Sequence, residues 1–167
     1  TPIYVIGTAR LSLRAHGLED FEDSAAMWAD PEVTRHIGGR PFTREESWSR
    51  LLRYTGHWAL LGFGYWAIHE RATGRFVGEA GFADYQREIV PSLGGLPEIG
   101  WALAPWAQGR GYATEAVRSA LEWGDGHFGL VRTVCFIESG NHASLRVAEK
   151  SGYREARRGI YKGKESI

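Results

Sequence analysis

The sequence contains very little cysteine and has no excess of charge of either sign. Cys135 is the one cysteine among 167 residues, and 20 basic residues balance 20 acidic ones. A single thiol excludes an intramolecular disulfide and is typical of a reducing cytoplasm. Without a basic stripe, nucleic acid is not expected as a partner. The six histidines are scattered rather than spaced as metal ligands, so no metal is expected either.

Long apolar runs are also missing. No segment approaches the roughly 18 apolar residues that span a bilayer, so we expect no membrane partner and a cytoplasmic location. What the sequence does have is a 43% hydrophobic share, with seven residues each of Trp, Tyr and Phe. We find no internal repeat or low-complexity linker, and expect residues 1–167 to form one domain with a sizeable core.

The first half of the chain contains boundary signals for helices and strands. Polar and apolar residues alternate over 10–14, which predicts a strand, and a helix is expected over about 18–28. Asp30-Pro31 is typical of an N-cap followed by proline at the first helical position. Thr43 and Glu46 have capping-box spacing and open a further helix, which ends at the glycines of residues 62–64. The apolar face of that helix is expected to carry Trp48, Leu51, Leu52 and Trp58.

The second half alternates strands with helices. Strands are expected over 65–69, 76–82, 98–103 and 133–137, with two short ones around residues 162–164. A loop is expected over 85–97, and helices over 111–127 and 143–150. This order describes a mixed α/β domain in which a run of strands precedes a strand-helix-strand unit.

A glycine-rich turn separates the strand over 98–103 from the helix that follows. Gly109 and Gly111 let the backbone approach a ligand closely and direct successive N–H groups into one concavity. The helix behind adds unpaired N–H groups and the positive end of its dipole. Charged hydrogen bonds contribute about 1.5–3 kcal/mol each, against ~0.3–1 kcal/mol from the dipole. Several amides on one diphosphate therefore dominate the predicted binding.

The turn differs from two other phosphate-binding motifs. The dinucleotide fingerprint needs a third Gly or Ala at its own spacing and follows the first strand, and a P-loop needs Gly-Lys-Ser/Thr. Gly-x-Gly alone is a weak signal, but here it reads Gln-Gly-Arg-Gly-Tyr-Ala between a strand and an amphipathic helix. Arg110 either adds a charged contact or is solvated as a turn residue.

In these residues the chain resembles the GNAT superfamily of acyl-CoA N-acyltransferases. Residues 108–113 match the family's Gln/Arg-x-x-Gly-x-Gly/Ala signature in full. Residues 99–103 are similar to its splayed fourth strand, and Asn141-x-x-Ser144 followed by residues 150–153 is similar to the end of its fifth strand and helix. The resemblance runs from about residue 10 to 161, and is strongest for the branch of ribosomal-protein N-terminal acetyltransferases and their small-molecule relatives.

The resemblance implies an α/β (mixed α+β) fold and an enzymatic activity. The expected fold has a mostly antiparallel central sheet of six to seven strands, a V-shaped splay between the fourth and fifth strands, and four to five flanking helices. The expected enzyme is an N-acetyltransferase with acetyl-CoA as co-substrate. A primary amine, on a protein N-terminus or a small molecule, would attack the thioester directly. Relatives often pair, so the resemblance leaves both a monomer and a homodimer open.

The resemblance also assigns a cofactor-binding set. Its members would be Trp101, Ala102, Leu103, Gln108, Gly109, Arg110, Gly111, Tyr112, Ala113, Thr114 and Asn141. The main chain of Trp101 and Leu103 would hold the pantetheine and polarise the thioester carbonyl. The amides of residues 109–113 would hold the diphosphate, and Asn141 would hydrogen-bond the pantetheine. Ser144 would protonate the leaving thiolate, in preference to Tyr153, which occupies a usual packing position.

An attacking amine must first lose its proton. At pH 7 this costs about 1.4 kcal/mol for an α-amine of pKa ~8, and about 4.6 kcal/mol for a lysine amine of pKa ~10.4. Glu98, at the start of the splayed strand, is the candidate base or water-relay group, with an exposed strand-end carboxylate as the competing interpretation. Glu79 is a second candidate. Glu115 more simply compensates the dipole of its helix.

Other reactive residues carry weaker signals. Cys135 alternates with its neighbours on a strand and has no paired base, which favours a buried inert thiol. His142 borders the ligand loop and is interpreted as surface or loop support. Trp28, residues 35–37 and Phe42 lie between the early helices, which form the acceptor wall in relatives, although loop packing explains them equally well.

Two other functions fit the same residues. A non-catalytic acyl-CoA-binding or sensing domain would have the same phosphate turn, but would release no free thiol in the presence of an amine. A nucleotide-binding module, based on the glycine turn alone, would be protected by ATP or NAD rather than by CoA.

Overall fold

Six strands form one sheet in chain order, from β1 to β6. The computed structural model describes residues 5–90, 92–93, 95–129 and 132–167, so residues 91 and 94 of the loop expected over 85–97 lie outside the described part. The strands are β1 (Ile6–Gly7), β2 (Leu11–Ala15), β3 (Tyr65–Glu70), β4 (Phe76–Ala83), β5 (Glu98–Leu103) and β6 (Val134–Cys135). Neighbours pair antiparallel except β5 and β6, which are parallel.

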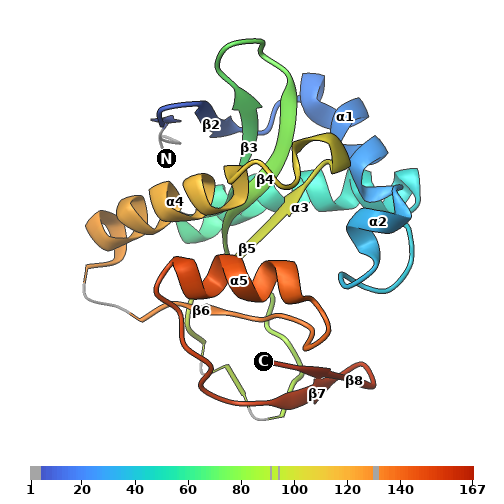
Figure 1. Ribbon diagram of the computed structural model, residues 1–167, viewed down its shortest axis with the longest axis vertical. Coiled ribbons are helices and arrows are strands. Elements are labelled where there is room, and N and C mark those ends of the chain that lie inside the picture. The colour runs from blue at the N-terminus through green and yellow to red at the C-terminus, as the bar shows by residue number, and fades with distance from the viewer. Residues whose placement is uncertain (1–4, 91, 94, 130–131) are drawn as a thin grey trace.

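Helices cover both faces of this sheet. They are α1 (Phe21–Trp28), α2 (Pro31–Thr34), α3 (Arg44–Leu61), α4 (Tyr112–Phe128) and α5 (His142–Lys150), with short 3₁₀ turns at Leu18–Asp20 and Pro105–Ala107. Figure 1 shows α4 crossing one face of the strands and α3 crossing behind them. A separate hairpin of β7 (Gly159–Tyr161) and β8 (Lys164–Ser166) lies beyond β6. The mixed α+β fold expected from the sequence is confirmed.

The helix boundaries follow the capping signals in the sequence. The Asp30 carboxylate accepts the N–H of Glu32 at 2.9 Å. Thr43 Oγ1 accepts the N–H of Glu46 at 3.2 Å, and the Glu46 carboxylate accepts the N–H of Thr43 at 3.3 Å, which completes the reciprocal capping box. Gly62 ends α3 in the left-handed conformation, with φ 76°.

The buried face of α3 differs from the one expected. Its buried residues are Ser47, Leu51, Tyr54, His57 and Trp58, whereas Trp48 is 40% exposed and Leu52 is 50% exposed. The stripe runs through positions 47, 51, 54 and 58 in steps of three and four, which places Trp48 and Leu52 at its margin. Trp48 instead packs edge-on against Phe21 of α1, with ring centroids 5.1 Å apart.

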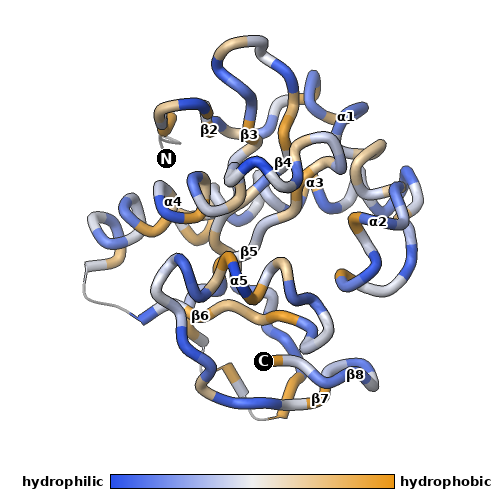
Figure 2. Tube along the Cα trace, viewed as in Figure 1, coloured by the Kyte–Doolittle hydropathy of each residue, from blue (hydrophilic) through white to orange (hydrophobic). Residues whose placement is uncertain are grey.

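The apolar core lies on both faces of the sheet. Alternate residues of β5 point to opposite sides, so Ile99 and Leu103 pack with Val117 of α4 in one cluster, while Ala102 packs with Trp28 in another. Figure 2 shows hydrophobic positions along the central strands and hydrophilic ones over much of the β7–β8 hairpin. The sheet is therefore packed on both faces, and its α1–α3 side supports the residues of the site described below.

The strand expected over 133–137 is much shorter than predicted. Only Val134 and Cys135 pair with β5, opposite Glu98 and Ile99. The chain then turns away because Ile137 exchanges two backbone hydrogen bonds with Ile167, at 2.9 and 2.7 Å. The C-terminal segment thus draws the chain away from β5 and opens the sheet into the expected splay. β1 was not predicted from the sequence, because two residues carry no periodic pattern.

Candidate active site

The open edge of β5 is the first part of the site. The N–H of Ala104 donates to the carbonyl of Val77 in β4, at 2.8 Å. Backbone groups alternate in direction along a strand, so those of Trp101 and Leu103 point away from β4, toward the splay. The register assigns neither residue a partner in β6. Their main-chain donors and acceptors therefore border the opening between the two strands.

The glycine turn after β5 presents a row of unpaired amides. In the described part of the chain, the N–H groups of residues 109–114 have no acceptor, whereas those of Gln108 and Glu115 bond to Pro105 and Gly111. Gly109 and Gly111 have φ of 75° and 78°, a left-handed conformation that L side chains rarely adopt. A Cβ added at Gly109 would meet no atom within 4 Å. The turn is thus open in front of its donors.

Side chains brace this turn from behind. Gln108 donates through Nε2 to the carbonyl of Leu103 at 3.2 Å, which fastens the turn to the end of β5. Arg10 donates to the carbonyl of Arg110 at 2.9 Å and pairs with Glu115 at 2.7 Å. Thr8 donates to the same carboxylate at 2.6 Å. Glu115 therefore clamps the β1–β2 turn to α4, beyond the dipole role expected from the sequence.

The side chains of Tyr112 and Arg110, also in this turn, form hydrogen bonds within the protein. Tyr112 is buried, and its hydroxyl donates to Glu70 at 2.6 Å. The exposed Arg110 donates through Nε to the carbonyl of Trp106 at 3.1 Å, so its guanidinium folds back along the turn. Ala113 and Thr114 form the first turn of α4. The row of free donors in this turn therefore comes from the main chain, with the Nη groups of the exposed Arg110 beside it.

A cleft of about 1240 Å³ lies on the α1–α3 side of β5. It reaches the splay through Glu98, Gly100 and Trp101, and its opposite wall includes Asn141 and Ser144 of the α5 segment. The glycine turn does not line it, so the turn and the cleft occupy separate parts of the site. The cleft is large enough to hold a small molecule beside the splayed strand.

Glu98 is buried at the floor of this cleft. Only 6% of the residue is exposed, which excludes the exposed strand-end interpretation. Arg87 donates to both carboxylate oxygens, at 2.9 and 2.8 Å. The bidentate pair fixes the direction of the carboxylate. Arg87 had no signal in the sequence, because it lies in the irregular segment between β4 and β5.

Asn141 and Ser144 meet at the start of α5. Asn141 Oδ1 accepts the N–H of Ser144 at 3.3 Å and so caps the helix. The Asn141 side-chain NH₂ and the Ser144 hydroxyl form no hydrogen bond within the described residues, and both side chains border the cleft. The side chain of Asn141, which was expected to hydrogen-bond the pantetheine, thus also caps the helix through Oδ1.

This geometry agrees with the comparisons to known proteins. The family described as "Acetyltransferase (GNAT) domain" matches residues 10–154. The chain belongs to this family. It is an N-acetyltransferase, and enzymes of this kind use acetyl-CoA.

Relatives match over most of their length. The uncharacterized N-acetyltransferase p20 of Bacillus licheniformis is 28% identical over 149 residues, covering 89% of this chain and 81% of that protein. The crystal structure of an acetyltransferase from Agrobacterium tumefaciens has a TM-score of 0.84 at 26% identity, covering 99% and 94%. The ribosomal-protein-S5-alanine acetyltransferase of Vibrio fischeri shares the fold, with a TM-score of 0.71 at 16% identity, covering 98% and 93%.

In this GNAT chain, Tyr65 also reaches the splay. Tyr65, Gly81 and Gly100 are successive partners across β3, β4 and β5, so they share one face of the sheet. A Cβ at Gly100 would lie 2.0 Å from the Tyr65 hydroxyl oxygen. The glycine therefore makes room for that hydroxyl in the cleft. Burial raises the pKa of Tyr65 well above its ordinary value, which keeps the hydroxyl protonated.

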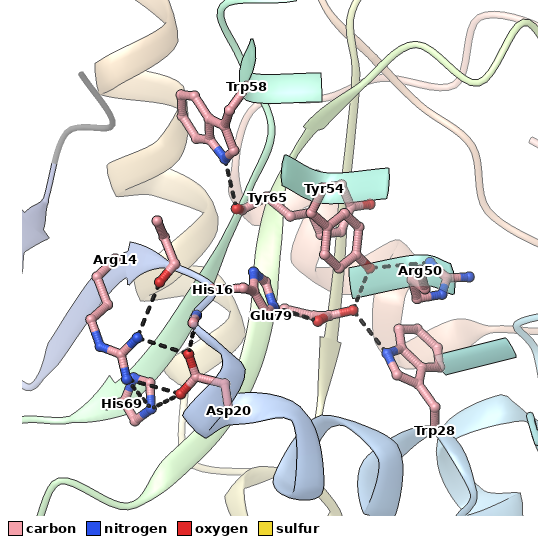
Figure 3. Close-up of polar contacts among 12 residues, drawn as sticks. Arg14, His16, Asp20, Trp28, Arg50, Tyr54, Trp58, Tyr65, His69 and Glu79 are labelled. Carbon is pink, nitrogen blue, oxygen red and sulfur yellow. Dashed lines mark hydrogen bonds and ion pairs between the residues drawn. The ribbon is translucent and has the colours of Figure 1, made fainter. Parts of the chain in front are cut away.

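Glu79 is the centre of a buried network on the same face. Its carboxylate accepts hydrogen bonds from Trp28 Nε1 at 2.9 Å and from the Tyr54 hydroxyl, and lies 2.9 Å from His16 Nε2 (Figure 3). Burial favours a raised pKa for Glu79. The hydrogen bond and charge of His16, the charge of Arg50 and the hydrogen bond from Tyr54 outweigh burial and hold the pKa below its usual value. Glu79 does not line the cleft. It supports the wall rather than reaching a substrate.

The other residues considered in the sequence are mostly packed, hydrogen-bonded or exposed away from the reacting groups, and some of them line the cleft. Burial raises the pKa of Cys135 to about 12, as fits an inert thiol. Burial also raises the pKa of Tyr153 to about 12, and its hydroxyl bonds to Thr133 at 2.6 Å, consistent with a packing position. His142 is exposed at the first position of α5. Of the expected acceptor wall, Trp28, His36, Ile37 and Phe42 line the cleft.

Proposed function

We propose that this N-acetyltransferase binds acetyl-CoA across the glycine turn and the open edge of β5, and transfers the acetyl group to a primary amine in the cleft. The observation that carries the proposal is the run of unpaired amides over residues 109–114, next to the end of β5 at Trp101 and Leu103, which has no strand partner on its outer side among the described residues. The amine belongs to a small molecule or to a protein N-terminus.

The donor set at the turn fits a diphosphate. Main-chain N–H groups at the start of α4 offer hydrogen bonds together with the positive end of the helix dipole. The carboxylate in the first turn of α4, Glu115, is occupied by Thr8 and Arg10, so it does not compete for the amides. The Arg10 guanidinium adds positive charge 3.4 Å from the position of a Cβ at Gly111. An anion would therefore meet donors on several sides.

The open edge of β5 supports binding of an extended chain that contains amide groups. The main chains of Trp101 and Leu103 offer donors and acceptors in the direction in which another strand would pair. The Leu103 carbonyl already accepts from Gln108, so the other groups of these two residues are the freer ones. An N–H aimed at a thioester carbonyl stabilises the negative charge that develops there during amine attack.

Glu98 is the proposed proton acceptor for the amine, directly or through a water. Deprotonation costs about 1.4 kcal/mol for an α-amine and about 4.6 kcal/mol for a lysine-like amine at pH 7. The carboxylate lines the cleft beside the splayed strand, and Arg87 fixes its orientation. The Ser144 hydroxyl, at the positive end of α5, is the proposed proton donor to the departing thiolate.

A matched pair of glycine variants tests the phosphate turn. Gly109 and Gly74 have nearly equal φ, 75° and 74°, and a Cβ at either would meet no atom within 4 Å. Gly109→Asp and Gly74→Asp therefore impose the same strain, but only the first places a carboxylate among the amides. Loss of two charged hydrogen bonds, at about 1.5–3 kcal/mol each, corresponds to a CoA affinity lower by at least about 100-fold for Gly109→Asp.

Isothermal titration calorimetry measures the affinity for CoA. Urea unfolding measures the loss of unfolding free energy caused by backbone strain. Gly74→Asp is expected to bind CoA like the wild type and to lose as much unfolding free energy as Gly109→Asp. Equal CoA affinity in both variants would remove the turn as the diphosphate site.

A further inference from the structure

Four arginines line the cleft, and they differ in their partners. Arg40 pairs with Glu46 at 2.9 Å, and Arg87 pairs with Glu98 at 2.8 Å. Arg50 and Arg53, one turn apart on α3, form no ion pair with any carboxylate in the described residues. A guanidinium in a cleft without a carboxylate partner is an open binding site for an anion.

Arg50 is held in place without a direct ion pair to a carboxylate among the described residues. Its Cζ lies 4.3 Å from the centre of the Trp28 ring and 5.0 Å from that of Phe42. Nη1 donates to the Tyr54 hydroxyl at 3.2 Å (Figure 3). No hydrogen bond of Nε or Nη2 to another described residue is present. The aromatic rings and the hydroxyl thus fix a half-buried cation, with one edge of its fork free.

Glu79 does not occupy that free edge. Its two oxygens are taken by Trp28, Tyr54 and His16. The Tyr54 hydroxyl stands between Arg50 and Glu79, accepting from the first and donating to the second. Glu79 therefore orients Arg50 through Tyr54, and leaves the guanidinium edge to a ligand.

Most acidic groups along the cleft already have partners of their own. Glu138 lies 3.6 Å from both His36 and Lys164, and the Asp84 carboxylate accepts two hydrogen bonds from Gln86. Glu45 is exposed in the first turn of α3. Arg53, whose Cζ lies 4.6 Å from the Tyr85 ring centre, adds a second cation without a carboxylate partner. The α3 wall thus presents positive charge.

We propose that the acceptor of this enzyme is a small amine that also carries a carboxylate, and that Arg50 binds this carboxylate. The inference rests on the proposed function. A planar guanidinium edge matches the two oxygens of a carboxylate in a bidentate pair. Arg50 and Glu98 line the same cleft, so one molecule can offer its amine to the splay and its carboxylate to α3. A polyamine would instead meet two unpaired cations.

Acetylation of matched acceptors by two variants tests this assignment. The acceptors are the common L-amino acids, β-alanine and γ-aminobutyrate, each compared with its carboxamide. Arg50→Gln removes the charge, and Arg44→Gln is the control on the same helix, because Arg44 pairs with Glu22 outside the cleft. Release of CoA thiol gives kcat/KM for each acceptor, and titration gives the Kd for acetyl-CoA.

The wild type and Arg44→Gln are expected to prefer at least one carboxylate over its carboxamide by about 10-fold or more. Arg50→Gln should lower kcat/KM for that carboxylate about 10- to 100-fold, and change the carboxamide value and the acetyl-CoA Kd by less than about threefold. Preference for the carboxamide in every pair, or equal losses for both members of a pair, would overturn the inference.

A binding measurement covers acceptors outside this panel. N-acetyl amino acids are products of the proposed class, so a mixture of them should bind the CoA complex of the wild type more tightly than that of Arg50→Gln. Absence of such binding in the wild type would overturn the inference. Failure of the wild type to bind acetyl-CoA would instead contradict the proposed function, which keeps the two conclusions separate.

Discussion

Replacing Gly100 with alanine tests the packing that places the Tyr65 hydroxyl in the cleft. The new Cβ would lie 2.0 Å from the Tyr65 oxygen and 3.2 Å from its Cζ. Observed Cβ atoms essentially never approach a heavy atom closer than 3.0 Å, so one of the two groups must move by about 1 Å. Overpacking of this size costs about 1–3 kcal/mol of unfolding free energy.

Tyr65 has little freedom to move. Its ring stacks on Tyr54, with centroids 4.6 Å apart and planes at 4°, and the Tyr54 hydroxyl is bonded to Glu79. Tyr65→Phe removes the oxygen and leaves Cζ at 3.2 Å from the new methyl, which needs an adjustment of only a few tenths of an ångström. The double variant should therefore recover most of the loss caused by Gly100→Ala.

Urea unfolding of the wild type, the two single variants and the double variant gives the coupling energy. Tyr65→Phe alone should cost about 1 kcal/mol. The double variant should be more stable than the sum of the single effects by at least about 1 kcal/mol, within the range for residues in contact. Additive effects, within about 0.5 kcal/mol, would refute the steric reasoning.

Two further predictions concern buried titratable groups. Glu79→Gln should lower the unfolding free energy at pH 7 by about 3 kcal/mol, the value of one or two charged hydrogen bonds. Because the folded pKa of Glu79 lies below its usual 4.5, its contribution is complete above that pH and is lost as the pH falls through the folded pKa. The difference between wild type and variant in urea unfolding should then shrink as the pH falls below 4.5, and a constant difference would contradict the assignment. Cys135 is partly buried, and its pKa is about 12. It should react with a thiol reagent at pH 8 at least about 100-fold more slowly in the folded chain than in urea, and rates within about tenfold would contradict the raised pKa.

The sequence predicted the features whose causes lie close together in the chain. The capping box of α3 and the proline start of α2 depend on residues within a turn of each other, so their spacing alone identifies them. The positive φ of Gly109 and Gly111 likewise depends on the residue type at each position and on its immediate neighbours. These signals are sufficient for the element order and for the glycine turn after β5, because backbone conformation is decided within a few residues.

The charged face of the cleft had one overlooked signal in the sequence. Arg50 occupies a position three residues after Ser47 and four before Tyr54, inside the buried stripe of α3. A long cation within such a stripe indicates a buried or ligand-binding role. The apolar face expected for α3 included Trp48 and Leu52, whereas the buried stripe includes Ser47 and Tyr54. The expected face therefore did not indicate a role for Arg50.

What the sequence determined by itself is the family, the order of elements and the turn beside β5, because each is encoded by short-range spacing. Tertiary structure alone decided the partners: Arg87 on Glu98, Arg10 on Glu115, and His16 with Trp28 on Glu79. These contacts join residues 11 to 105 positions apart. Charge pairing at such separations follows from how the sheet and helices stack, and no local pattern specifies which carboxylate each cation will meet.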